Sequence, residues 1–70
     1  MLWNLEGKVV NAMYLGDIPC EGVVRRSLVQ YGGEIGHFID VTAPVKIGQR
    51  VETEGLMIEH KFITKVRDSI

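Results

Sequence analysis

The stretch LMIEHKFITKV, residues 56–66, alternates between apolar and polar side chains along most of its length. Because an extended chain points successive side chains to opposite faces, such alternation is typical of a strand with one buried side. The apolar face would hold Leu56, Ile58, Phe62, Thr64 and Val66, and the polar face Glu59, Lys61 and Lys65. No segment keeps a helical period over the roughly ten residues that a stable helix needs. The chain is therefore predicted to be all-β, without a substantial helix.

Four more segments complete a set of five predicted strands. Three of them lie in the first part of the chain, at residues 8–15, 21–31 and 34–41. The fourth, RVETEG at residues 50–55, ends at Glu54-Gly55, where a tight hairpin would join it to the long strand. The segment 42–49 contains two strand breakers, a proline and a glycine, and is predicted to be a connection.

Two local signals refine the pairing of the second and third strands. Gly32-Gly33 lies between two β-rich runs and predicts a hairpin turn, since both central residues of a type I′ turn need a positive φ. In residues 21–31 neither face is cleanly apolar. A bulge near Arg25-Arg26 would resolve this, because one extra residue exchanges the two faces and bends the strand.

Five short antiparallel strands predict a single domain, residues 1–70, folded as a small and strongly bent barrel. The strand count and loop lengths resemble those of SH3-like barrels. An OB-fold usually places a helix between its third and fourth strands, and residues 42–49 are too few and too broken to form one. This resemblance identifies no family.

The size of the chain predicts that it associates with itself or with a partner. A domain of this length removes only about 60% of its unfolded surface from water, so small domains usually add a disulfide, a metal or an oligomer interface. Cys20 is the only cysteine, which excludes an internal disulfide. With His37 and His60 it supplies three of the four ligands that a structural zinc site needs. We therefore predict no metal and no cofactor.

Apolar residues outside the expected core are the candidates for the protein interface. Tryptophan and methionine are enriched at the centres of interfaces, where large and adaptable side chains are desolvated. The predicted interface residues are Trp3, Leu5, Met13, Met57 and Ile63.

The charge balance argues against a general polyanion binder. Eight lysines and arginines face nine acidic residues, for a net charge of −1, whereas modules that bind phosphate backbones tend to be basic. Two alternatives to a protein partner remain open: a nucleic acid bound by a basic strand face, and a small anion such as a nucleotide bound between subunits. The residues available for these roles are Arg25, Arg26, Tyr31, Lys46, Arg50, Lys61 and Lys65.

No motif specifies a reaction. The glycines of YGGEIG lead into a strand, with no lysine or serine placed to bind phosphate, so they do not form a phosphate loop. His37 and Asp40 are three apart on a strand and would point to opposite faces, which prevents them from acting as an acid and base pair. His37 and His60 both fall on inward faces and can approach each other. The chain is predicted not to be an enzyme.

The sequence thus predicts a small β-barrel that binds other proteins as an adaptor or regulator, with homo-oligomer formation expected. The first residues, MLWNLEGK, lack the basic and apolar pattern of a secretory signal. Together with the single free cysteine, this predicts a cytoplasmic location and no association with membranes.

Overall fold

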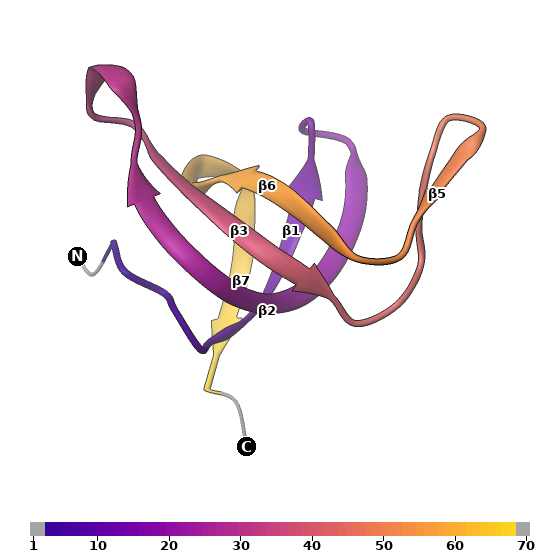
Figure 1. Ribbon diagram of the computed structural model, residues 1–70, viewed down its shortest axis with the longest axis horizontal. Helices are drawn as coiled ribbons and strands as arrows, with labels where there is room; N and C mark the ends of the chain where they lie inside the picture. The colour runs from indigo at the N-terminus through magenta and orange to yellow at the C-terminus, as the bar shows by residue number, and fades with distance from the viewer. Residues whose placement is uncertain (1–2, 69–70) are drawn as a thin grey trace.

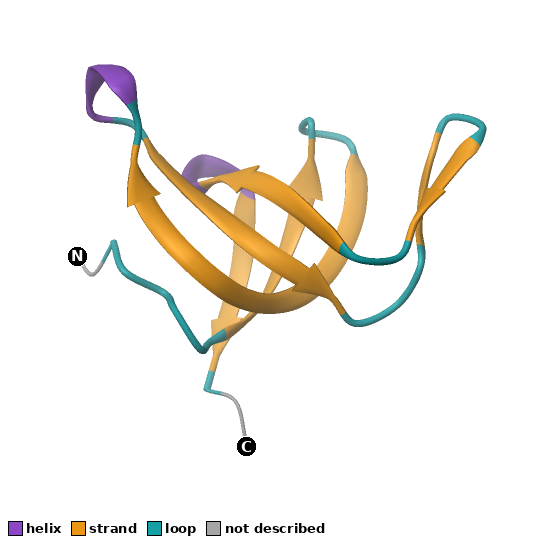
Figure 2. Cartoon of the chain, viewed as in Figure 1, coloured by secondary structure: helices purple, strands orange, loops and turns teal. Residues whose placement is uncertain are grey.

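The computed structural model describes residues 3–68 and is all-β (Figures 1 and 2). Two short 3₁₀ turns, η1 and η2, are the only helical elements in this range. The elements are β1 (Val9–Tyr14), β2 (Ile18–Val29), η1 (Tyr31–Gly33), β3 (Ile35–Val41), β4 (Val45–Ile47), β5 (Arg50–Glu52), β6 (Gly55–Glu59), η2 (His60–Phe62) and β7 (Ile63–Arg67). The prediction of an all-β chain without a substantial helix is confirmed.

Five of the strands form one antiparallel sheet in the order β6-β3-β2-β1-β7. β2 sweeps across the molecule in one long curve and carries the sheet round, so that β1 and β6 contact each other across the core (Figure 1). Within residues 3–68 no ladder joins β6 to β7. The sheet therefore has two edges, one at β6 and one at β7.

The curvature of β2 has a local cause. Val24 pairs with Ile39 and Arg26 pairs with Phe38, which leaves Arg25 as one extra residue in β2. The bulge exchanges the two faces, so that Val24 and Ser27 are both buried on the inner side. This confirms the bulge predicted at Arg25-Arg26.

The inner face of the bent sheet forms one core. Ile39 is completely buried, and the alternate residues of every neighbouring strand pack around it. The buried apolar residues are Leu5, Val10, Ala12, Cys20, Val24, Ile39, Val45, Leu56 and Ile58.

The β2–β3 hairpin has a longer loop than expected. Gly32 and Gly33 have φ values of 82° and 83°, as the glycine signal predicted. The N–H of Gln30 donates to the carbonyl of Glu34 at 2.6 Å, and the 3₁₀ turn Tyr31–Gly33 lies between them. The reversal thus takes three residues, not the two of a type I′ turn.

The predicted strand at residues 50–55 does not join the main sheet. Its first half, β5, pairs with β4 in a separate hairpin that projects from the body of the molecule (Figure 1). Gly48, with a φ of 63°, lies at the reversal between these two strands. The prediction that 42–49 is a connection, with 50–55 paired to the long strand, was therefore wrong. β6 pairs with β3 instead.

The predicted long strand, residues 56–66, is two strands separated by η2. Ile63 packs against the core while Thr64 and Val66 are exposed, and Thr64 is the extra residue where the pairing of β7 with β1 shifts register. β7 then pairs with β1. The sheet thus contains the expected five strands. Its last two, β6 and β7, both come from the predicted long strand, whereas the predicted strand at residues 50–55 contributes β5 to the separate hairpin.

Candidate functional site

A chain of hydrogen bonds crosses the core where β2 and β3 approach η2. His37 on β3 is fully buried, and its Nε2 lies 2.7 Å from Nδ1 of His60 in η2. On the other side of the ring, Nδ1 of His37 lies 2.7 Å from the Ser27 hydroxyl. The inward positions of the two histidines left open whether they meet, and the structure shows that their rings do. We call Ser27, His37 and His60 the histidine relay.

One assignment of the protons gives the buried Ser27 hydroxyl both a donor and an acceptor. Its oxygen accepts from the N–H of Leu5 at 2.9 Å, and Nδ1 of His37 is the acceptor within reach of its O–H. In this assignment a neutral His37 carries its proton on Nε2 and donates to Nδ1 of His60. Every buried polar atom of the relay has a partner.

Burial keeps His37 neutral. Removal of His37 from water lowers its pKa, and the nearby His60 lowers that pKa further by repelling a second positive charge.

The outer end of the relay reaches a shallow, open hollow of about 230 Å³. Its lining residues are Gly33, Glu34, Ile35, Glu59, His60 and Lys61. The relay offers no serine nucleophile to this hollow, because Ser27 is buried and its hydroxyl is engaged with both Leu5 and His37.

The remaining candidates for catalysis or metal binding lie apart. The Cys20 thiol is buried, lies 3.6 Å from the carbonyl of Ala12, and has its pKa raised by burial, which keeps it protonated. Asp40 points away from His37, as predicted, and pairs with Arg25 at 3.2 Å. Across residues 3–68 no three His, Cys, Asp or Glu side chains are grouped so that they could hold a metal ion.

The outer face of the β2–β3–β6 region carries an apolar surface next to the β6 edge. Leu28, Phe38 and Met57 come from three adjacent strands, and Met57 is 40% exposed. Gly55 makes room for the Phe38 ring: a Cβ at this glycine would lie 2.7 Å from a ring carbon. At Gly36 a Cβ would lie 2.4 Å from the Gln30 amide nitrogen, so this glycine marks a second point of close approach. We call Leu28, Phe38 and Met57 the outer apolar surface.

The residues predicted to form an interface are not gathered in one place. Leu5 is 6% exposed and belongs to the core, and Ile63 packs against it, so both have little surface for a partner. Met13 on β1 is half-buried. Trp3 is 41% exposed, similar to Met57. Sequence reasoning missed Leu28 and Phe38.

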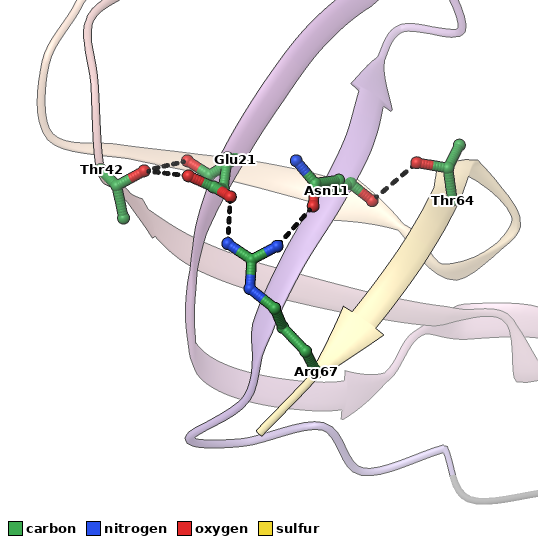
Figure 3. Close-up of polar contacts among 5 residues, drawn as sticks. All are labelled: Asn11, Glu21, Thr42, Thr64 and Arg67. Carbon is green, nitrogen blue, oxygen red and sulfur yellow. Dashed lines mark hydrogen bonds and ion pairs between the residues drawn. The ribbon is translucent and has the colours of Figure 1, made fainter. Parts of the chain in front are cut away.

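The basic residues do not form the stripe that pairing of the last strand with β2 would produce, because β1 lies between β2 and β7. Lys65 is paired with Asn11, and the next residue across the sheet is Glu21. Arg67 bridges Glu21 and Asn11, and Thr42 also binds Glu21 (Figure 3). An acidic side chain thus interrupts this surface.

The other candidates for anion binding are dispersed. Arg26 is on the outer face of β2, Arg50 pairs with Glu52 at 3.0 Å in the projecting hairpin, and Lys46 lies on the facing strand β4. Tyr31 is fully exposed at η1, and Lys61 lies in η2 with its ammonium 5.2 Å from the centre of the Phe62 ring. No observation favours one anion site made from these residues.

Comparison of the chain with protein-family models, with curated proteins and with solved structures found no match. Residues 3–68 include no helix with the length and apolar character needed to cross a bilayer.

Proposed function

We propose that this chain is a small, non-enzymatic binding module that acts through protein–protein contacts and assembles with copies of itself. The observation that carries the proposal is an unpaired sheet edge, β6, with the outer apolar surface beside it. Unpaired strand edges bind other chains by adding a strand, and exposed apolar side chains next to such an edge add affinity. The chain presents both features, because β6 is the edge and carries the exposed Met57, beside the half-buried Phe38 and Leu28 of the next two strands.

The proposal includes an SH3-like barrel. Its support is the order of the strands: the first strand lies inside the sheet, the last strand lies beside it, and a 3₁₀ turn leads into that last strand. The bulge at Arg25 supplies the bend that a small barrel needs. In such a barrel the outer faces and the two edges are the surfaces open to partners.

Two features of the buried residues support a role without catalysis. The hydroxyl of Ser27 and the thiol of Cys20 lie inside the core, and the neutral His37 is bonded at both ring nitrogens. The protonated thiol of Cys20 also agrees with a reducing compartment such as the cytoplasm, where we propose that the module works.

Sedimentation equilibrium of the full chain, over a range from micromolar to millimolar, tests the proposal. We expect an average mass that rises with concentration above the 7.9 kDa of the single chain. A mass that stays at the monomer value throughout this range would contradict self-assembly. The same measurement at high salt is the control. Apolar and backbone contacts are weakened less by salt than ion pairs between exposed side chains, so association through the β6 edge should persist.

A further inference from the structure

The β6 edge has a hydrogen-bonding pattern that can be worked out residue by residue. The N–H of Thr42 donates to Glu21 of the β2 side, whereas the N–H of Val41 donates to Glu54 of the β6 side. Successive backbone groups of a strand point to opposite sides, so the odd-numbered residues of β3 bond to β6. Among these are His37 and Ile39, which pair with Ile58 and Leu56.

It follows that the even-numbered residues of β6 use their backbone groups within the sheet. Gly55, Met57 and Glu59 are the remaining residues of the strand, and their N–H groups point to the open edge. In the part of the chain that the structure describes, no strand pairs with this side of β6. Met57 is the middle residue of the strand, so a two-fold axis through the centre of a β6–β6 pair would pass beside it.

The two edges of the sheet differ in how they are protected. β7 carries Lys65 and Arg67, and its pairing with β1 shifts register at Asn11, a combination of charge and irregularity that discourages strand addition. β6 has the sequence GLMIE, with no lysine, arginine or proline and with its single charge at the end. Of the two edges, β6 is the one open to another strand.

The geometry points to a second copy of this chain as the strand that β6 binds, in an antiparallel β6–β6 pair centred on Met57. This inference deepens the proposed function and rests on it. An antiparallel pair about a two-fold axis sets Met57 opposite Met57 of the other copy, so the two residues exchange two N–H···O bonds. Glu59 then lies opposite Gly55 of the other copy, and its N–H meets the Gly55 carbonyl.

The side chains fit this arrangement. Phe38 is paired with Met57 on the outer face, so the two-fold axis produces one continuous apolar row of Phe38 and Met57 from both copies. The charges also agree, because each Glu59 faces a glycine of the other copy. A parallel pair would instead set Glu59 beside Glu59. A five-residue edge buries less than a standard interface, so we expect micromolar association.

Amide hydrogen exchange, measured by NMR on the full chain at low and high concentration, tests the inference. In the single chain, the amides of Leu56 and Ile58 are protected by β3, whereas those of Met57 and Glu59 exchange rapidly. At concentrations where sedimentation shows association, we expect the Met57 and Glu59 amides to become at least about tenfold slower. The amides of β7 provide the control and should keep their rates.

The possible failures are distinguishable. If the chain associates but the Met57 and Glu59 amides exchange as fast as in the dilute sample, the β6–β6 pair is wrong and the proposed self-assembly stands. If the chain is a monomer at every concentration, both are wrong.

A matched pair of variants adds a second test. Met57→Lys would set two ammonium groups side by side at the two-fold axis, and we expect it to weaken association by about tenfold or more. Val66→Lys alters an equally exposed residue on β7 and should leave association unchanged. Protection of the Leu56 and Ile58 amides shows that each variant is folded. Equal effects of the two variants, or none from Met57→Lys, would overturn the inference.

Discussion

The main sheet and the β4–β5 hairpin are both built from short β-rich segments, yet they are held in different ways. In the sheet, Ile39 and Ile58 are at most 1% exposed, and each inner strand is paired on both sides. In the hairpin, Val45 is the one residue buried in the core, while Val51 is 57% exposed. Alternation in the sequence therefore predicts extended chain, but stability depends on what the alternate side chains can pack against. The predictions below test this difference.

The largest effect is expected in the centre of the sheet. Ile39→Ala removes a fully buried side chain and should lower the free energy of unfolding by about 2–5 kcal/mol, because the cavity cannot collapse between paired strands. Val51→Ala in the hairpin is the control, and we expect a change within about 0.5 kcal/mol. Urea unfolding followed by circular dichroism measures both. Comparable losses for the two variants would show that the hairpin is as well packed as the sheet.

The histidine relay should give the next largest effect. His37→Leu fills the space but leaves the Ser27 hydroxyl and Nδ1 of His60 without their partner, at an expected cost of about 1–3 kcal/mol in unfolding free energy. The double variant His60→Phe with His37→Leu removes one of these unpaired groups, Nδ1 of His60, whose only hydrogen bond among the described residues is the one to His37. Stability should recover partly if the lost hydrogen bond is the cause. A double variant with the summed cost of both single changes would argue for packing instead.

The pH dependence of stability follows from the lowered pKa of His37. In the unfolded chain His37 binds a proton as the pH falls below about 6.5, whereas the folded chain resists protonation until a lower pH. Stability should therefore decrease as the pH falls below that value, by at most about 1.4 kcal/mol per pH unit for this group. Above it, His37 contributes no slope. The measurement is the free energy of unfolding of the protein and of His37→Leu at several pH values between 7 and 5. If this free energy changes equally steeply with pH in both, His37 is not the cause of the pH dependence.

The smallest effect concerns the hairpin itself. Arg50→Ala removes an exposed ion pair with Glu52, and such pairs contribute about 0–1 kcal/mol. We expect no resolvable change in the midpoint of unfolding, but faster amide exchange in β4 and β5 than in β2 and β3, both before and after the substitution. Exchange in the hairpin as slow as in β3 would show that the two regions unfold as one unit.

The parts of the fold that sequence reasoning reached are those with a local signal. The bulge at Arg25 was visible because the apolar residues of β2 change faces at that point. The inward position of His37 followed from its apolar neighbours. By contrast, β4 is three residues long, which is shorter than the run needed to recognise a strand.

The break at η2 was hidden for a different reason. The turn and the extra residue Thr64 change which face each residue occupies, but Phe62 and Val66 still look like members of the same alternating series in the sequence. The outer apolar surface was missed because Phe38 lies against Gly55, a residue distant in sequence. Neither feature can be recognised without knowing which strands are neighbours.

The histidine relay also constrains the order of folding. Its bonds join residues separated by 22, 10 and 23 positions, from Leu5 through Ser27 and His37 to His60. Contacts between such distant parts of the chain form late, since the loops between them must close first. The relay is complete only when the N-terminal segment, the β2–β3 hairpin and η2 have all assembled. The ring proton signals of His37 would thus report when these three parts of the chain have come together.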